Sequence, residues 1–441
     1  MQVSIEATGT LERCLTVKIP EERITSEVAN RITSLSRTAR IQGFRPGKAP
    51  LKLVQRLYGD QVRQEVIGEV IRSSFVEAIN TNGLRPAGDP SIESIDAGSD
   101  QGFAYKATFE VYPEITLAPL ESLKIMKPVC EITEEDIDKR IEDSRRQRQR
   151  WESVDRPAQK GDQLDVDFQG TVEGETVGET KGFKFELGSG RLIAGFEEGL
   201  IGASASNERR LDLVFPSDYQ DPKLAGKPVE FTIKVNSVSE SVLPDLNEDL
   251  FEQFGVSEGG LARFREELRK RLEYERDQGA RDRMKAQVME ALLNANPIEI
   301  PRVLMEAEAR RLQQQARMRA LIYQMAPEEV EALSPAMFEK QAQRRVALGL
   351  ILSAIIRSAD LKAGPAKVRS MVERLAASHE DPASVIKWYY EDRERLHEVE
   401  MAVLEEEVVE WVLTRAHIEE RPMTFGALMS PEQNEGSEES A

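Results

Sequence analysis

One window of the sequence, residues 28–59, holds no acidic side chain and collects seven cations: Arg31, Arg37, Arg40, Arg45, Lys48, Lys52 and Arg56. At its centre stands Gly-Phe-Arg-Pro-Gly-Lys-Ala-Pro, and this density of glycine and proline predicts a tight turn between two helices. The turn would present one aromatic ring, Phe44, beside two cations, Arg45 and Lys48. Cations attract phosphates and carboxylates, and an aromatic ring fills an apolar pocket, so these residue types suit docking onto a protein–RNA surface. The alternative is a loop whose ring folds back onto its own helices, with ordinarily solvated charges.

Few other residues have the types and spacing that chemistry requires. The three histidines, His379, His397 and His417, lack metal-ligand spacing and are expected on the surface or in packing. The two cysteines, Cys14 and Cys130, form no Cys-x-x-Cys pair, which argues against a disulfide scaffold and fits a reducing compartment. The C-terminal region shows no nucleophile–base pairing and no nucleotide-binding motif. The sequence therefore predicts neither a metal nor a cofactor.

The chain of 441 residues has room for about three domains. Its net charge of −19 repels nucleic acid on average, so any RNA-facing site must be a local patch of opposite sign. The N-terminal residues combine neither a basic stretch nor an apolar core, so no signal peptide is expected. The longest nearly apolar run, Val346 to Ile356, is too short to cross a bilayer. We therefore expect a soluble, cytosolic protein with no membrane partner.

The first 115 residues predict an α+β domain. Alternating apolar residues over 11–19 and 103–111 indicate strands, and Thr8-Gly9-Thr10 can turn the first back onto a strand that holds Val3 and Ile5. Apolar residues at three- or four-residue steps predict helices at 21–40, 51–58 and 62–79.

The middle of the chain changes character twice. Thr133 and Asp136 have the spacing of a capping box, and they begin a polar helix that reaches Arg150. This helix has little to bury, so we expect a connecting arm. Between Gly161 and Ser239, short alternating strands separated by glycine turns predict an antiparallel sheet with one buried face.

After Pro244 no strand pattern remains, and helices are expected at 258–294, 302–325, 337–359, 365–378, 383–390 and 393–416. This region holds ten of the 12 methionines, together with an apolar stripe over residues 350–356. Methionine suits surfaces that accept many partners, whereas the alternative is that these side chains fill helix–helix cores. Residues 430–441 hold four glutamates and no cation, which predicts a disordered tail.

Two segments resemble known families. The turn at residues 43–50 resembles the signature of trigger factors, whose N-terminal domain docks beside the ribosomal exit tunnel. The resemblance marks Phe44, Arg45 and Lys48 as ribosome-binding residues. Residues 161–239 resemble an FKBP-type prolyl isomerase, most specifically in Phe183-Lys-Phe-Glu-Leu-Gly188 and Leu192-Ile-Ala-Gly-Phe-Glu-Glu-Gly199.

The FKBP resemblance implies an apolar pocket that twists the peptide bond before proline. This reaction needs no acid, base, metal or cofactor, because its barrier of roughly 18–20 kcal/mol comes from lost amide resonance. A dry aromatic pocket can favour the twisted form. The alternative is that the aromatics only form the core of a small β domain. By the resemblance, Phe196 is the floor, Tyr219 donates to a substrate carbonyl, and the full lining is Phe168, Phe183, Leu192, Ile193, Phe196, Tyr219 and Phe231.

One wall of this implied pocket departs from the family pattern. Where relatives often have a phenylalanine followed by an acidic residue, this chain has Val177 and Gly178. We therefore expect a thinner wall and a missing carboxylate, unless Glu179 substitutes for it. This departure could reduce the isomerase activity.

Together these expectations describe an ATP-independent chaperone that binds nascent polypeptides and isomerises X-Pro bonds. The predicted fold class is multidomain α+β: an N-terminal α+β ribosome-docking domain, an inserted antiparallel-sheet FKBP-like domain and an elongated all-helical body. The implied partners are the exit-tunnel protein and rRNA surface of the ribosome, unfolded nascent chains and, off the ribosome, a second copy of the chain. The expected boundaries are 1–115 for the docking domain, 116–155 for the linker and arm helix, 156–243 for the FKBP-type domain, 244–429 for the helical chaperone domain and 430–441 for the tail.

Two other functional classes stay open. A plain prolyl isomerase with helical dimerisation arms would need no basic window. An RNA-binding protein would call for basic stripes with stacking aromatics, but the window contains only Phe44 and Tyr58. Titration with naked ribosomal RNA and with whole ribosomes separates these classes.

Overall fold

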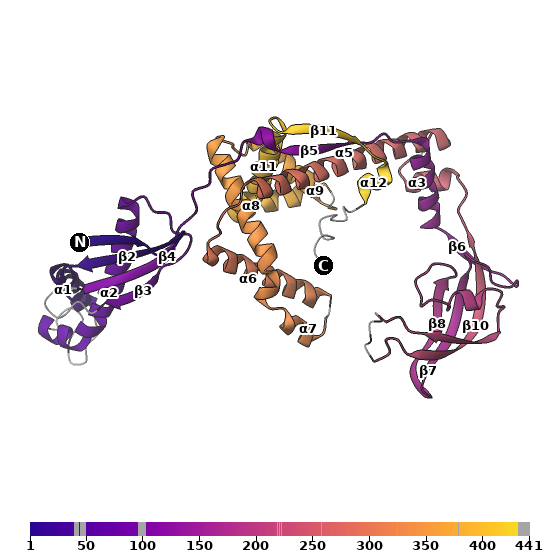
Figure 1. Ribbon diagram of the computed structural model, residues 1–441, viewed down its shortest axis with the longest axis horizontal. Helices are drawn as coiled ribbons and strands as arrows, with labels where there is room; N and C mark the ends of the chain where they lie inside the picture. The colour runs from indigo at the N-terminus through magenta and orange to yellow at the C-terminus, as the bar shows by residue number, and fades with distance from the viewer. Residues whose placement is uncertain are drawn as a thin grey trace. The chain divides into compact units, whose positions relative to one another are not determined.

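The computed structural model describes residues 1–38, 44, 50–95, 103–217, 219, 221, 223–256, 258–323, 325–377 and 379–430. The chain divides into two compact units, Met1–Lys127 with Asp282–Arg421, and Pro128–Arg281 with Pro422–Ala441 (Figure 1). The second unit therefore takes most of its residues from an insertion between the two parts of the first. Each unit is described by itself below.

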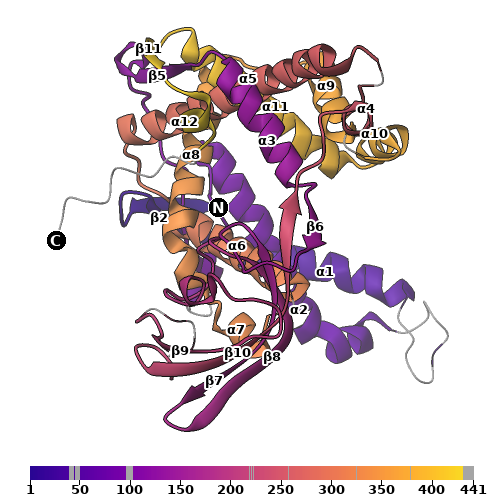
Figure 2. The same ribbon diagram turned by 90° about the vertical axis from the view of Figure 1, so that its right-hand side faces the viewer.

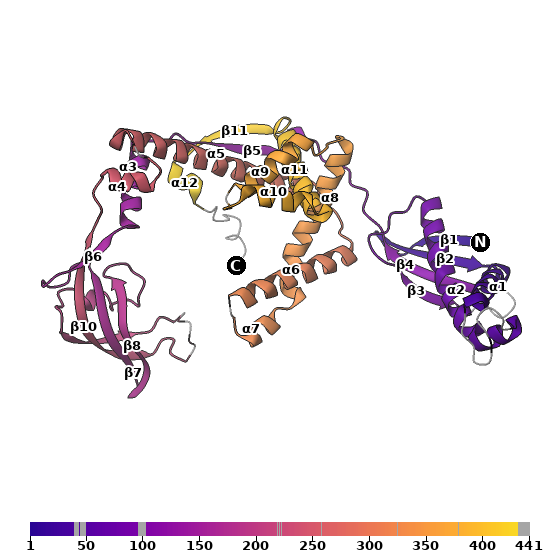
Figure 3. The ribbon, with the colours of Figure 1, turned by 180° about the vertical axis from the view of Figure 1, so that it is seen from behind.

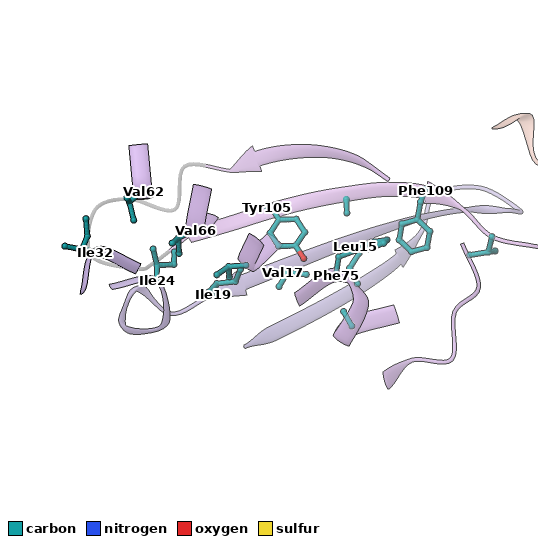
Figure 4. Close-up of a cluster of buried hydrophobic side chains, with 14 of the residues drawn as sticks. Leu15, Val17, Ile19, Ile24, Ile32, Val62, Val66, Phe75, Tyr105 and Phe109 are labelled. Atoms are coloured by element: carbon teal, nitrogen blue, oxygen red, sulfur yellow. The ribbon is translucent and has the colours of Figure 1, made fainter. Parts of the chain in front are cut away.

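A four-stranded antiparallel sheet opens the first unit, in the order β1 (Gln2–Ala7), β2 (Glu12–Ile19), β4 (Phe103–Glu110) and β3 (Ser91–Ile95). Helices α1 (Glu21–Thr38) and α2 (Leu51–Thr81) supply the rest of its core. Alternation along β2 buries Leu15, Val17 and Ile19, which pack with Tyr105 of β4 (Figure 4). The Tyr105 hydroxyl lies 2.9 Å from the hydroxyl of Ser74 on α2, so the buried polar group is satisfied. The predicted α+β character is confirmed.

Helix α2 corrects one prediction from the sequence. Separate helices were expected at 51–58 and 62–79, but α2 runs unbroken from Leu51 to Thr81. Val54, Val62 and Val66 are all buried along it. This continuous apolar stripe outweighs the roughly 1 kcal/mol that Gly59 costs inside a helix.

The second unit contains an antiparallel sheet in the order β6 (Arg150–Ser153), β10 (Pro228–Val242), β7 (Gln163–Val172) and β8 (Glu175–Glu186), with β9 (Glu208–Val214) paired to β10. The predicted antiparallel sheet is therefore confirmed. Its far end narrows to a two-stranded ribbon, because β6 pairs only with the last part of β10, from Ser153 opposite Ser239 to Arg150 opposite Val242 (Figure 2).

The ribbon leads into helix α3 (Glu134–Arg146), which begins with the predicted capping box. The Thr133 hydroxyl accepts from the Asp136 amide at 3.2 Å, and the Asp136 carboxylate accepts from the Thr133 amide at 2.9 Å. The expectation that this helix has little to bury is wrong. Ile137 and Ile141, one turn apart, are buried against the first half of α5 (Gly260–Ala295), and α4 (Glu248–Gln253) adds Phe251 to the same core.

The helical body of the first unit combines the second half of α5 with α6 (Arg302–Ile322), α7 (Pro327–Ala332), α8 (Glu339–Ser358), α9 (Pro365–Ala376), α10 (Pro382–Tyr390) and α11 (Arg393–Leu413). Ile351 and Ile355 of α8 are fully buried between α5 and α11. The apolar stripe of α8 is therefore core. The methionines divide: Met289 and Met371 are buried, whereas Met318 and Met337 are largely exposed.

Three strands outside the second unit's sheet were not predicted: β3 and one further pair. The sequence showed no strand pattern after Pro244, yet β11 (His417–Pro422) pairs with β5 (Lys124–Val129). All six residues of β11 are exposed, so there is no alternation to detect. A short helix, α12 (Phe425–Met429), follows in the second unit. Residues 431–441 of the predicted tail lie outside the described residues. Among the described helices, none combines the length and apolarity needed to cross a membrane.

Candidate functional site

Six phenylalanines meet on the inner face of the second unit's sheet. Phe168 lies at their centre, with ring centroids 5.7 Å from Phe183, 5.7 Å from Phe196 and 6.0 Å from Phe231. All three pairs meet edge to face, the arrangement that the ring quadrupoles favour. Phe185 and Phe215 complete the cluster, at 6.1 Å from Phe196 and 6.2 Å from Phe231.

The side chains of the cluster differ in their solvent exposure. Phe196 is only 3% exposed, and Phe231 is buried beside it at 5.3 Å. Phe168 and Phe183 are half-buried, as are Leu192 and Ile193, which pack against the same core. Phe196 is the most deeply buried of the six rings, and its place as the pocket floor stays a prediction. The arrangement is an apolar cluster that combines buried and half-buried rings.

Tyr219 lies further out than the other expected lining residues. Its ring centroid is 4.5 Å from that of Phe215, and the residue is 37% exposed. Among the ring contacts of the described residues, Tyr219 reaches the cluster through Phe215, a residue that was not predicted as a site residue. Phe185 was also missed, although it stands two residues after Phe183 on the same strand, the spacing that puts side chains on one face.

The thin wall predicted at Val177 and Gly178 lies on β8, the edge strand of this sheet. Val177 is exposed, and Gly178 pairs with Gly170 of β7. A Cβ added at Gly170 would stand 3.1 Å from the Phe231 ring and 3.5 Å from Val177, so the backbone passes close to the cluster here. The Glu179 carboxylate pairs with Lys181 at 3.0 Å on the exposed strand.

Beside the cluster is a cavity of about 380 Å³, lined by Leu192, Ile193 and Glu197 among others. Glu197 is a buried carboxylate that accepts hydrogen bonds from the loop before it. Burial by itself raises the pKa of Glu197, but the backbone amides of Gly190 and Gly188 outweigh burial and hold that pKa below its ordinary value. The side chain is therefore an anion at neutral pH.

The basic window is only partly described. Phe44 is 42% exposed, whereas Arg45 and Lys48 lie outside the described residues. Lys52 and Arg56 are exposed in the first two turns of α2. Arg31 forms an ion pair with Glu69 at 3.3 Å on the helix surface. The described part of the window thus presents cations and one exposed phenyl ring.

The end of α6 exposes an apolar surface that sequence reasoning could not locate. Ile322 is 75% exposed and Tyr323 is 73% exposed, more than any other large apolar side chain among the described residues. Helices α6 and α7 extend beside α8, apart from α9 and α11 (Figure 3). We call this surface the arm patch: Met318, Leu321, Ile322, Tyr323 and Met325.

No other cluster in the described part of the chain suggests chemistry. The described residues contain no group of three or more His, Cys, Asp or Glu side chains that could hold a metal. Cys14 and Cys130 are free and buried.

Comparisons with known proteins agree over nearly the whole chain. Residues 1–144 match the family model described as bacterial trigger factor protein, residues 260–414 match that of the trigger factor C-terminus, and residues 154–236 match that of FKBP-type peptidyl-prolyl cis-trans isomerase. Trigger factor from Pseudomonas fluorescens (strain Pf0-1) is 45% identical over 435 residues, 98% of each chain. Trigger factor from Azotobacter vinelandii (strain DJ / ATCC BAA-1303) is 44% identical over 433 residues, again 98% of each.

A solved structure of the trigger factor chaperone, concerned with promiscuous substrate recognition in folding and assembly activities, shares the fold. It covers 94% of this chain and 99% of its own, with a TM-score of 0.50 at 17% sequence identity. The described residues accordingly show an N-terminal α+β part, an antiparallel FKBP-like part and a helical body. The chain belongs to the trigger factor family of chaperones, and its middle part is an FKBP-type peptidyl-prolyl isomerase domain.

Proposed function

We propose that this chaperone holds apolar segments of nascent polypeptides on its helical body, without ATP, while docked on the ribosome near the exit tunnel. The observation that carries the proposal is the arm patch. Soluble proteins rarely leave adjacent large apolar side chains this exposed unless a partner covers them. Unfolded chains supply such a partner, because their apolar side chains have not yet found a core.

The chemistry of the arm patch suits clients of many sequences. Met318 and Met325 are unbranched and flexible, so they can adapt to differently shaped side chains. Burial of apolar area is itself favourable, so holding a client needs no nucleotide. Release then follows from competition, as the client buries the same side chains in its own core.

The aromatic cluster would serve X-Pro bonds in the held chain. Their uncatalysed isomerisation takes tens of seconds and can limit folding. A pocket floored by Phe196 and walled by Phe168, Phe183 and Phe231 would strip water from the prolyl amide and accept its twisted form. Leu192 and Ile193 would close the other wall, and Tyr219 would donate to a substrate carbonyl at the rim.

Docking would use Phe44, Arg45 and Lys48. The exposed phenyl ring supports this role, because a ring folded onto its own helices would be covered. In a chain of charge −19, the cations of a sequence window without acidic residues can find the phosphates and carboxylates of a ribosomal surface. We place this activity in the cytoplasm, where the two free thiols stay reduced. Off the ribosome, the arm patch would favour pairing with a second copy of the chain.

Ribosome pelleting tests the docking role. We expect Phe44→Ala with Arg45→Ala to abolish co-sedimentation, because the variant loses both the apolar anchor and a cation. Wild-type binding should weaken as salt rises, since its cationic part is screened. The matched control is Arg72→Ala with Val76→Ala on α2, which removes one exposed cation and one exposed apolar side chain outside the window.

Unchanged pelleting of the loop variant would contradict the docking assignment. Equal binding to naked ribosomal RNA and to whole ribosomes would instead favour an RNA-binding protein. Both variants should keep the wild-type thermal unfolding profile, because Phe44, Arg72 and Val76 are exposed.

A further inference from the structure

Glu197 is one of the few charged residues that are buried among the described residues, with 5% of its surface exposed. Five donors from a single loop converge on its carboxylate. One oxygen accepts from the amides of Gly188 at 2.7 Å and Gly190 at 3.2 Å. The other accepts from the Ser189 hydroxyl at 3.0 Å and from the amides of Arg191 at 3.1 Å and Leu192 at 3.4 Å.

These bonds define a loop that has no helix or strand of its own. Gly188 and Gly190 adopt left-handed φ angles of 93° and 69°, which other residues rarely take. A Cβ at Gly188 would also stand 2.5 Å from the Lys160 side chain, so the loop lies tightly against its neighbour. Without the carboxylate, four backbone amides would lose their shared acceptor, and the loop would lose its fixed path.

The loop ends at the wall of the pocket. Leu192 donates its amide to Glu197, and the side chains of Leu192 and Ile193 pack against the aromatic core. On the other side, Glu197 directly follows Phe196, the floor of the pocket. One buried side chain therefore fixes the wall relative to the floor.

We infer that Glu197 is a positioning residue for prolyl isomerisation, whose anionic carboxylate holds Leu192 and Ile193 in the geometry that fits the twisted amide. The inference rests on the pocket assigned under the proposed function. A pocket stabilises the twisted amide over the planar one only if its walls stay in place, and a loose wall would fit both forms poorly.

The substitution Glu197→Gln separates the charge from the shape. Glutamine keeps the length of the side chain, but its amide nitrogen is a donor and would face backbone N–H groups that need an acceptor. At least two of the five hydrogen bonds are then lost. Glu197→Asp keeps the charge but shortens the side chain by one methylene, so it should retain part of the cradle.

The experiment measures kcat and KM for a proline-containing peptide by exchange NMR, on the full chain. We expect kcat/KM of Glu197→Gln to fall about tenfold or more, with a lower kcat and a higher KM, and Glu197→Asp to restore part of the loss. Partial unfolding of the Glu197→Gln variant would give a different result, because a smaller folded fraction lowers the apparent kcat and leaves KM unchanged. The control is Glu186→Gln, an exposed carboxylate at the start of the same loop, which should behave as wild type.

Hydrogen exchange at the amides of Gly188, Gly190 and Leu192 reports the loop directly. It should be fastest in Glu197→Gln, intermediate in Glu197→Asp and unchanged in Glu186→Gln. Faster exchange with unchanged kcat and KM would overturn the inference, because the loop would then be loose without consequence. A loss of kcat at constant KM would also overturn it in favour of a purely structural role. An inactive wild type would contradict the isomerase pocket itself, and the inference with it.

Discussion

At the scale of single residues, the pocket shows why a catalytic side chain and a core side chain are hard to separate. Phe196 packs against Phe168, Phe185 and Phe231 and is nearly inaccessible. Truncating a buried phenylalanine to alanine costs about 3–5 kcal/mol of stability, so Phe196→Ala would disturb the packing of the whole cluster as well as the proposed pocket floor. Residues at the rim are better probes.

Tyr219 offers such a probe, because its exposed hydroxyl can be removed without opening a cavity. We expect Tyr219→Phe to lower kcat/KM for a proline peptide by about two- to tenfold, the range set by one hydrogen bond of roughly 0.5–1.5 kcal/mol. The ring and its contact with Phe215 remain, so the thermal midpoint should not change.

The matched control for this variant is Tyr274→Phe on α5, where the tyrosine is also exposed. Exchange NMR on both variants gives the comparison. Activity equal to wild type in Tyr219→Phe would show that the hydroxyl does not contact the substrate carbonyl.

At the scale of elements, the sequence predicted what a local pattern can encode. The alternation in β2, the capping box at Thr133 and the helical spacing along α1 each identified their element. The single helix α2 was predicted as two, because Gly59 looks like a break unless the buried valines on both sides are seen to share one face. Strand β11 carries no alternation, since its pairing with β5 depends on a partner nearly 300 residues away in sequence.

The same limit applies to the candidate site. The motif resemblance brought out Phe168, Phe183, Phe196 and Phe231, which the structure brings together. Phe215 lies within the resembling segment but was not predicted as a lining residue, and only the structure shows its contacts with Phe231 and Tyr219. The sequence likewise could not predict which methionines are exposed. Met289 and Met318 both lie in helical patterns, but Met289 is buried and Met318 is exposed, because neighbouring helices pack against only one of them.

The arm patch gives the prediction that belongs to this scale. We expect Leu321→Ser with Ile322→Ser to weaken binding of an unfolded client by about tenfold, since part of two apolar side chains can no longer be buried. Fluorescence anisotropy of a labelled, permanently unfolded client measures this affinity. The fold should be unaffected, because both side chains are exposed at the end of α6.

The control for the patch variant is Val76→Ser with Ile92→Ser, which removes two exposed apolar side chains from the N-terminal α+β part. Equal affinity in the patch variant and the wild type would place client holding elsewhere. Weaker binding in both variants would indicate general stickiness rather than a defined patch.

At the scale of the whole molecule, the FKBP-type domain is an insertion whose two connections are paired. Ser153 of β6 stands opposite Ser239 of β10, and the ribbon continues to Arg150 opposite Val242. Below the ribbon, the Gln149 side chain accepts from the Ser241 hydroxyl at 2.7 Å, and Arg145 donates to the Pro244 carbonyl at 2.8 Å. These contacts anchor the ribbon to α3 independently of the pocket.

This geometry predicts that the domain can be removed cleanly. Directly opposed residues of antiparallel strands have Cα atoms roughly 4.5–5.5 Å apart, a gap that a two-residue Asn-Gly turn can close. We expect a chain in which Asn-Gly replaces residues 154–238 to fold, to keep client affinity and to lose all isomerase activity. Circular dichroism, anisotropy and exchange NMR measure folding, client affinity and isomerase activity, with the wild type as the reference.

A second variant carries the same Asn-Gly splice between Glu152 and Glu240, which are also directly opposed. It should give the same results as the first splice. Loss of client binding in both spliced chains would show that the FKBP-type domain contributes to client binding. Client binding and isomerisation would then share part of one binding surface.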